Sequence, residues 1–161
     1  MDTPLTDQPD DAEPGAEEEL RAGMEHLFFA YRDFIAQPDR ILTEYGFGRA
    51  HHRVIFFVGR YPGMAVRQLL EILQITKQSL SRVLRQLIRE GYVEQRQGET
   101  DRRQRRLYLT RQGTELERRL SEDQRQRFAR AYGTAGPDAV RGFRTVLDLM
   151  ISGPPKGGGG G

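Results

Sequence analysis

The chain has 161 residues, enough for one domain built around one hydrophobic core. It contains no cysteine, which excludes disulfides, thiolate metal sites and thiol redox sensors. The formal net charge of +2 hides an asymmetry, because residues 1–19 carry eight acidic residues and no basic one. The rest of the chain is therefore strongly basic. No apolar run reaches the roughly 20 residues of a membrane span, so we expect a cytoplasmic protein with no membrane contact.

The first 17 residues combine proline with uncompensated acid and have almost nothing to bury. We expect a disordered acidic arm; it either solvates the chain or folds back on the basic part and competes with whatever binds there. A helix should follow over residues 18–38, with an apolar stripe that includes Leu20, Met24, Leu27 and Phe28. Pro38 should end it, because proline lacks the amide hydrogen that a helix interior needs.

Residues 45–63 contain a Gly-x-Gly pair and two adjacent histidines. Gly46 and Gly48 do not form a dinucleotide motif, since no strand precedes them and the third glycine is missing. His51 and His52 would point about 100° apart on a helix and cannot readily chelate one ion together. We therefore expect no metal and no cofactor, and a helix that stops at Pro62-Gly63.

Two short apolar periodicities follow, separated by a tight turn. Val66, Leu69, Leu70 and Leu73 share one helical face, and Leu80, Val83, Leu84, Leu87 and Ile88 share another. Thr76 is placed to cap the second helix and Gly91 to stop it. The opposite face of the second helix carries hydrogen-bond donors with little apolar bulk, which suits the major groove of DNA. These residues are Lys77, Gln78, Ser79, Ser81, Arg82 and Arg85.

The next segment reads as a hairpin with a basic tip. Residues 92–96 and 105–110 are strand-like, with Leu107 and Leu109 directed inward, and Gly98 and Asp101-Arg102-Arg103 lie between them. Residues 76–111 hold ten basic and four acidic residues, a local charge of +6. A basic hairpin after a helix-turn-helix predicts a winged helix over residues 47–110, in a mainly α fold with a small β wing.

Two further helices are expected over residues 111–151. Thr110 can cap the first, a break is expected from Gly133 to Gly136, and Pro137 can open the second. The second carries apolar residues with the 3-4-3 spacing of a helix–helix seam, namely Val140, Phe143, Leu147 and Met150. These faces and the stripe of residues 18–38 are too apolar to cover only a small lobe. They favour a dimerisation domain of N- and C-terminal helices; the alternative is packing within one chain. Residues 152–161 should form a flexible, glycine-rich tail.

The helix ITKQSLSRVLRQL, the strand GYVEQR and the segment DRRQRRLYLT followed by Gly113 resemble the MarR family of bacterial transcription regulators over residues 20–150. FFAYRDF and YGFGRAHHRV add a likeness to its PetP-type branch. The resemblance implies that Arg103 reaches into the minor groove and that Asp101 orients it. It also implies a homodimer and a small aromatic or phenolic effector, in a pocket for which Tyr31, His52 and Arg53 are candidates.

The sequence therefore predicts a regulator that binds double-stranded DNA as a homodimer on a pseudo-palindromic operator. Base contacts should come from Gln78, Ser79, Arg82 and Arg85, and because the chain has no asparagine, bidentate reading of adenine falls to Gln78. Thr76, Lys77 and Ser81 complete the helix surface. The wing should contribute Arg96, Asp101, Arg102, Arg103, Arg105 and Arg106, mostly at phosphates. An enzyme is not expected, because the usual nucleotide, nucleophile and metalloprotease motifs are missing. The alternative is a winged-helix module that binds an acidic protein.

Overall fold

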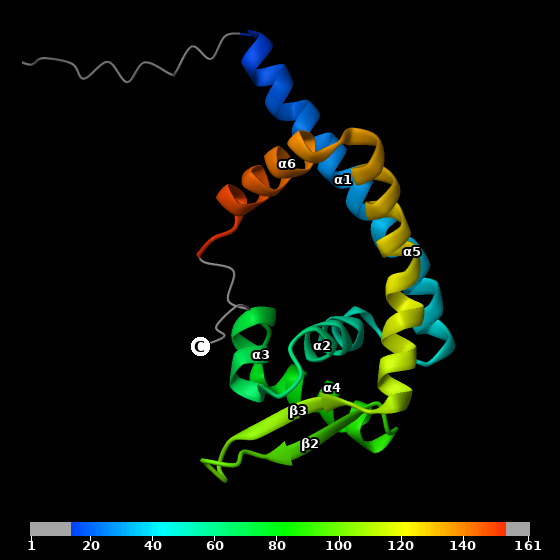
Figure 1. Ribbon diagram of the computed structural model, residues 1–161, viewed down its shortest axis with the longest axis vertical. Helices are drawn as coiled ribbons and strands as arrows, with labels where there is room; N and C mark the ends of the chain where they lie inside the picture. Colours follow the sequence, from blue (N-terminus) through cyan, green and yellow to red (C-terminus); the bar gives the residue numbers. More distant parts are fainter. Residues whose placement is uncertain (1–13, 154–161) are drawn as a thin grey trace, which may run out of the picture. The chain divides into compact units, whose positions relative to one another are not determined.

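The computed structural model describes residues 14–153, and these are mainly helical with one small sheet (Figure 1). The predictions of a disordered arm and a glycine-rich tail fall largely on residues 1–13 and 154–161, outside the described residues. The described residues divide between Ile35 and Ala36 into two compact units. The elements are α1 (Pro14–Glu44), α2 (Arg49–Arg60), β1 (Met64–Ala65), α3 (Val66–Leu73), α4 (Lys77–Arg89), β2 (Val93–Gln97), β3 (Arg105–Leu109), α5 (Arg111–Ala135) and α6 (Pro137–Met150).

The first helix is longer than the sequence predicted at both ends. It begins at Pro14, so residues 14–17 are helical rather than disordered; proline suits a first helical position because it needs no amide hydrogen there. The predicted stop at Pro38 is wrong, since α1 continues to Glu44. A proline inside a helix costs roughly 3 kcal/mol. Pro38 is fully buried, and burial of its apolar ring offsets part of that cost.

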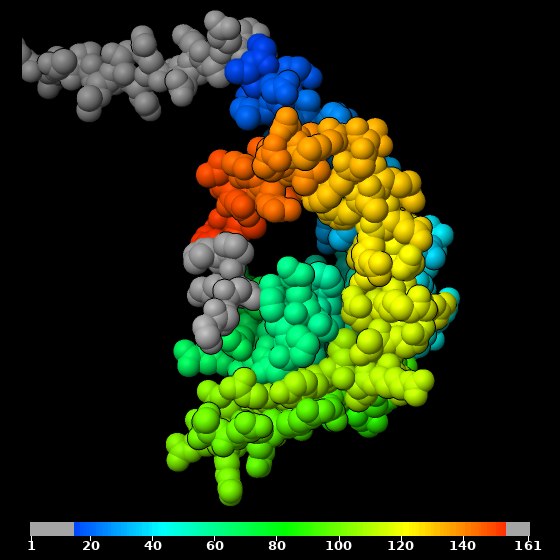
Figure 2. Space-filling view, viewed as in Figure 1, coloured from blue at the N-terminus to red at the C-terminus, as the bar shows by residue number. Residues whose placement is uncertain are grey.

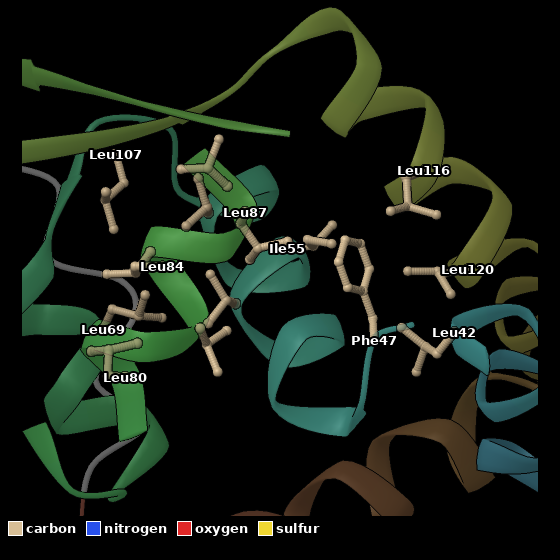
Figure 3. Packing of buried hydrophobic residues seen from close by; sticks show 14 of the residues in the cluster. Leu42, Phe47, Ile55, Leu69, Leu80, Leu84, Leu87, Leu107, Leu116 and Leu120 are labelled. Carbon is tan, nitrogen blue, oxygen red and sulfur yellow. The ribbon is translucent and has the colours of Figure 1, made fainter. Parts of the chain in front are cut away.

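The second unit is organised around one hydrophobic core (Figure 3). Its centre is α2, whose Val54, Ile55 and Val58 are completely buried. Leu69 of α3, Leu87 of α4 and Leu107 of β3 are also completely buried. The core extends beyond residues 47–110 on both sides, through Ile41 and Leu42 of α1 and through Leu116 and Leu120 of α5. The lobe therefore depends on the helices that flank it.

The helix-turn-helix is confirmed. In the turn between α3 and α4, Gln74 takes a left-handed conformation with φ of 49°. Thr76 caps α4 as predicted, because its hydroxyl accepts a hydrogen bond from the amide of Ser79 at 3.1 Å. Gly91 follows the helix with φ of 84°, a conformation that favours glycine.

The hairpin is also confirmed, within a three-stranded antiparallel sheet of order β1-β3-β2. Val93 pairs with Leu109 at one end of the hairpin and Gln97 with Arg105 at the other. Leu107 is buried and Leu109 is half-buried, in line with the predicted inward side. Strand β1 was not predicted, because two residues are too few to show an alternation. β1 pairs Met64 with Leu107 and closes the free edge of β3.

The two C-terminal helices form as expected. Thr110 caps α5 by accepting a hydrogen bond from the amide of Gly113 at 3.0 Å. Gly133 lies inside α5, so the predicted break is confined to Gly136, which has φ of 86°. Phe128 and Tyr132 of α5 meet Phe143 of α6, with ring centroids 5.3 to 6.5 Å apart. This aromatic cluster joins α6 to α5.

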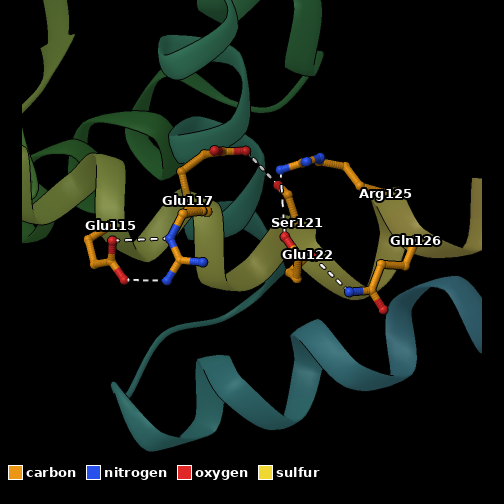
Figure 4. A network of polar contacts seen from close by, with 7 residues as sticks. Glu115, Glu117, Ser121, Glu122, Arg125 and Gln126 are labelled. Carbon is orange, nitrogen blue, oxygen red and sulfur yellow. Dashed lines mark hydrogen bonds and ion pairs between the residues drawn. The ribbon is translucent and has the colours of Figure 1, made fainter. Parts of the chain in front are cut away.

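The middle of α5 carries a row of polar contacts (Figure 4). Glu115 accepts from Arg118 at 2.7 Å, Glu117 accepts from the hydroxyl of Ser121, and Glu122 accepts from Gln126 at 2.8 Å. The exposed pairs, Glu115 with Arg118 and Glu122 with Gln126, each contribute a few tenths of a kcal/mol. They support a helix with few apolar residues along its length. None of the helices within residues 14–153 is long and apolar enough to cross a membrane.

Candidate nucleic-acid interface

Helix α4 presents a polar, basic face to solvent. Because Leu80, Val83, Leu84 and Leu87 are buried on one side, the other side must face outward. Lys77, Gln78, Ser81, Arg82 and Arg85 are all exposed there. Thr76 is exposed as well, but its hydroxyl is engaged with Ser79, whose half-buried side chain accepts from it at 2.8 Å. The hydroxyls of this pair hold the start of the helix, and the other five side chains are presented outward.

The tip of the hairpin, residues 98–104, is a closed loop at the lower edge of the molecule in Figure 2, where side chains project outward. The amide of Gly98 donates to the carbonyl of Gln104 at 2.8 Å, and the Asp101 carboxylate accepts from the amide of Arg103 at 2.9 Å. Asp101 therefore shapes the backbone at Arg103. Arg102 and Arg103 are exposed, and neither forms an ion pair within residues 14–153. Two exposed arginine side chains without an ion pair thus stand at the wing tip.

The arginines on the strands are held by protein groups. The Arg96 guanidinium lies 4.2 Å from the centre of the Tyr108 ring and pairs with Glu94. Arg105 donates to Gln95 at 3.3 Å. Arg106 is half-buried and donates to the carbonyl of Gly63 at 3.0 Å. These three side chains add positive charge to the wing, but they are less free to reach a ligand than those at its tip.

The candidate effector residues lie in different parts of the chain. Tyr31 is exposed on α1 in the first unit. In the second unit, Arg53 is exposed on α2 and His52 is half-buried. Burial lowers the pKa of His52, and the charges of Glu117 and Asp39 oppose that shift. Within residues 14–153, no three side chains of the metal-binding kinds come together.

His51 has a structural role that the sequence analysis missed. Its Nδ1 lies 3.0 Å from the amide nitrogen of Gly48, and its Nε2 lies 2.8 Å from Oε1 of Gln86 on α4. Its ring also stacks on Phe47, with centroids 4.8 Å apart. The spacing of Gly48 and His51 is that of a residue before a helix and the third residue inside it, and this could have signalled the capping contact.

A shallow hollow of about 240 Å³ opens on α4, lined by Arg82, Arg85, Gln86 and Arg89. Arg82 and Arg85 were predicted as DNA-binding residues, whereas Gln86 and Arg89 were not. Arg89 could have been added to the predicted basic face from the sequence, because Arg82, Arg85 and Arg89 recur at helical spacing on one face.

The predicted dimerisation residues are largely uncovered. Leu20, Met24, Leu27 and Phe28 on α1 are exposed, with Met24 at 73%. On α6, Phe143 and Met150 are exposed, whereas Val140 and Leu147 are half-buried. Val146 and Leu149, which were not among the predicted dimerisation residues, are 56% and 82% exposed. Helix α6 buries none of its residues completely, so much of its apolar face stays uncovered within residues 14–153.

A helix-turn-helix with an uncompensated basic face, followed by a hairpin with a basic tip, defines the class of winged-helix DNA-binding proteins. The chain belongs to the MarR family. A family model described as MarR family matches residues 45–104. The chain is 56% identical over 135 residues to the HTH-type transcriptional regulator PetP of Rhodobacter capsulatus, a match that covers 84% of this chain and 81% of PetP. The resemblance noted from the sequence is thereby confirmed.

Solved structures agree on the fold. FabT of Streptococcus pneumoniae, solved in complex with DNA, is 19% identical with a TM-score of 0.65, over 81% of this chain and 94% of that one. A mutant of S. aureus MepR bound to an oligodeoxyribonucleotide is 16% identical with a TM-score of 0.54, over 79% and 94% of the two chains. Membership of the family makes this chain a DNA-binding transcription regulator of MarR type.

Proposed function

We propose that the protein recognises a specific, pseudo-palindromic operator in the cytoplasm as a homodimer. The observation that carries the proposal is the outward face of α4, where Lys77, Gln78, Arg82 and Arg85 stand exposed on a helix that a buried apolar face holds in place. The three charged side chains, Lys77, Arg82 and Arg85, form no ion pair within residues 14–153. Their charge and hydrogen-bonding capacity are therefore available to a ligand, and DNA is the ligand of the family.

In this proposal α4 enters the major groove. Gln78, Arg82 and Arg85 read base edges, each bidentate pair contributing about 1 to 3 kcal/mol of discrimination. Lys77 and Ser81 meet phosphate or sugar, while Thr76 and Ser79 hold the start of the helix against the duplex. At the wing, Arg103 reaches into the minor groove, Asp101 fixes its backbone, and Arg102 contacts phosphate. Arg96, Arg105 and Arg106 provide the positive charge behind them.

The homodimer is supported by the uncovered apolar faces. The exposed residues of α6 and α1 are too apolar for a surface that stays in water, since each buried Å² contributes about 25 cal/mol. A second copy supplies matching faces. Two copies related by a two-fold axis would set their α4 helices roughly 34 Å apart, one turn of B-DNA. That spacing is why the operator should be an inverted repeat.

The proposal of a small-molecule effector rests on the family. Small aromatic or phenolic compounds would bind near Tyr31, His52 or Arg53 and change the separation of the two α4 helices. A panel of phenols and aromatic acids, added to the protein–operator complex, tests this part. Release of DNA by one of them, abolished by Arg53→Ala, is the supporting result. Release that Arg53→Ala and His52→Gln both leave unchanged would remove these residues from the proposal.

Selection of bound duplexes from a random DNA pool tests the main proposal. The expected product is one inverted repeat whose half-site centres lie about ten base pairs apart. Gln78→Ala should relax the preference at one position in each half-site and leave the repeat spacing unchanged. Recovery of unrelated sequences, or of single half-sites only, would contradict sequence-specific binding by a dimer with two-fold symmetry.

A further inference from the structure

The hollow on α4 gathers three positive charges that the protein does not neutralise. Arg82, Arg85 and Arg89 line it, and none of the three forms an ion pair with a carboxylate among residues 14–153. The one hydrogen bond that they make to a protein group is a long one, from Nε of Arg85 to the carbonyl of Ser81 at 3.4 Å. Elsewhere most arginines on the helices are paired, as Arg118 is with Glu115 and Arg119 with Glu44. Three like charges in one hollow favour an anion between them.

The fourth lining residue, Gln86, is held in a defined orientation. The amide of Gly48 can only donate, so Nδ1 of His51 must be the ring nitrogen without hydrogen. In the neutral ring the hydrogen then lies on Nε2, which donates to Oε1 of Gln86. The carboxamide oxygen of Gln86 is thus engaged at His51, and its amino group is left as a donor. No described group accepts from that amino group. The polar side-chain groups that line the hollow are therefore hydrogen-bond donors.

Of the residues that line the hollow, Arg89 lies farthest along α4 from Gln78. Arg89 lies eleven residues after Gln78, roughly 16 Å along the helix axis. That distance exceeds the major-groove width of about 12 Å. A helix that places Gln78 at base edges therefore brings Arg89 to the rim of the groove, where the backbone phosphates lie.

We propose that Arg82, Arg85, Gln86 and Arg89 form a binding site for a phosphate of the DNA backbone, and that His51 is a positioning residue which orients the Gln86 amide toward it. Arg89 supplies charge, Gln86 supplies a neutral donor, and Arg82 and Arg85 are shared with base reading. This site rests on the proposed function for its ligand. Through His51, the start of α2 thereby influences how tightly α4 binds the duplex.

Two variants test the site, with binding measured at several salt concentrations on an operator and on a scrambled duplex. Arg89→Gln should weaken binding to both duplexes by similar factors, about tenfold at low salt, and reduce the slope of log affinity against log salt by about 0.9, the value for one lost phosphate contact. Arg130→Gln is the matched control, because Arg130 is exposed on α5 outside the lobe; it should change neither quantity. A slope equal to that of the control, or a loss confined to the operator, would overturn the site.

The positioning role has its own readout. His51→Phe keeps a ring against Phe47 and removes both hydrogen bonds. It should weaken binding to both duplexes about threefold without changing the salt slope, since no charge is lost. Unchanged affinity with only a lower melting temperature would assign His51 a purely structural role.

Inorganic pyrophosphate tests whether the site binds a free anion instead of DNA. If Arg89→Gln abolishes pyrophosphate binding and leaves DNA binding intact, the assignment of the site to DNA is wrong. If the wild type fails to prefer the operator, the proposed specificity fails, whereas the shared salt slope still tests the phosphate site.

Discussion

At the scale of single residues, the arginines of the wing are of two kinds. Those at its tip face solvent, whereas those on its strands are held by contacts with other protein groups. Arg103 is exposed, its backbone is fixed by Asp101, and it makes no ion pair within residues 14–153. Arg106 donates to the carbonyl of Gly63 and is half-buried. Substitution of Arg103 should therefore affect only the binding of DNA, whereas substitution of Arg106 would also disturb the sheet.

We predict that Arg103→Ala weakens operator binding at least tenfold and leaves the dimer intact. The substitution removes the guanidinium from the narrow minor groove, and no other group of the protein replaces its contacts with the DNA. A gel-shift titration gives the affinity, and light scattering checks the dimer. Unchanged affinity would remove the wing tip from the interface.

His52 gives the fold a dependence on pH. Burial lowers its folded-state pKa below the ordinary value of 6.5, so the folded chain favours the neutral ring. Its contribution to stability is fully present above about pH 6.5 and is lost as the pH falls through the lower folded-state value. Urea unfolding of the wild type should therefore show a falling free energy between pH 7.5 and 5.5, and His52→Gln should flatten that fall. An equal slope in both proteins would contradict the assignment.

At the scale of elements, the junction of the wing with α5 depends on a close approach. A Cβ on Gly113 would lie 1.9 Å from the carbonyl oxygen of Tyr92, a backbone atom. The hydroxyl of Thr110 strengthens the same junction by donating to the carbonyl of Gly91 at 2.6 Å. The end of α4, the start of β2 and the start of α5 therefore meet through main-chain contacts.

Gly113→Ala should destabilise the fold by about 3 kcal/mol, because one of two backbones must move. Gly133→Ala is the matched control on the same helix, where nothing lies within 4 Å of the new methyl. It should stabilise the fold by about 0.5 to 1 kcal/mol, as alanine does over glycine in a helix. Urea unfolding at one protein concentration measures both. Equal effects of the two substitutions would contradict the close approach.

Elements with a strong local signal could be predicted from the sequence. The caps at Thr76 and Thr110 and the stop at Gly91 were read from residue type and spacing, and the structure confirms them. Two features depend on contacts between distant residues and could not be read locally. Pro38 stays inside α1 in a buried position, and β1 exists only because β3 lies beside it.

The candidate site shows the same limit. The exposed face of α4 followed from the apolar periodicity, which fixes both sides of a helix together. The contact of His51 with Gln86 joins residues 35 positions apart, and no spacing rule predicts it. The engagement of Ser79 in the cap, and of Arg106 with Gly63, likewise became visible only in three dimensions.

At the scale of the whole molecule, the apolar face of α6 is the feature that calls for a second chain. Leu149 is 82% exposed and Val146 is 56% exposed, and an amphipathic helix with such a face is stable in water only when that face is covered. Phe143 is tied to α5 by aromatic contacts, so α6 is held in place to present the rest.

Leu149→Glu should convert the dimer to a monomer, because it places a charge in an apolar interface. Arg144→Glu, an exposed polar position on the same helix, is the control for the added negative charge and should leave the dimer intact. Sedimentation velocity at micromolar concentration distinguishes the two species. A Leu149→Glu variant that still sediments as a dimer would place the interface elsewhere.

Fluorescence anisotropy can show whether the protein recognises a specific DNA sequence. The protein is titrated onto the intergenic duplex upstream of its own gene and onto a scrambled duplex of equal length, each at two salt concentrations. We predict tight binding to the first duplex, at least a hundredfold weaker binding to the second, and a steep loss of affinity with salt on both. Equal affinity for the two duplexes would contradict sequence-specific recognition of this operator. A basic surface that binds an acidic protein would give that result.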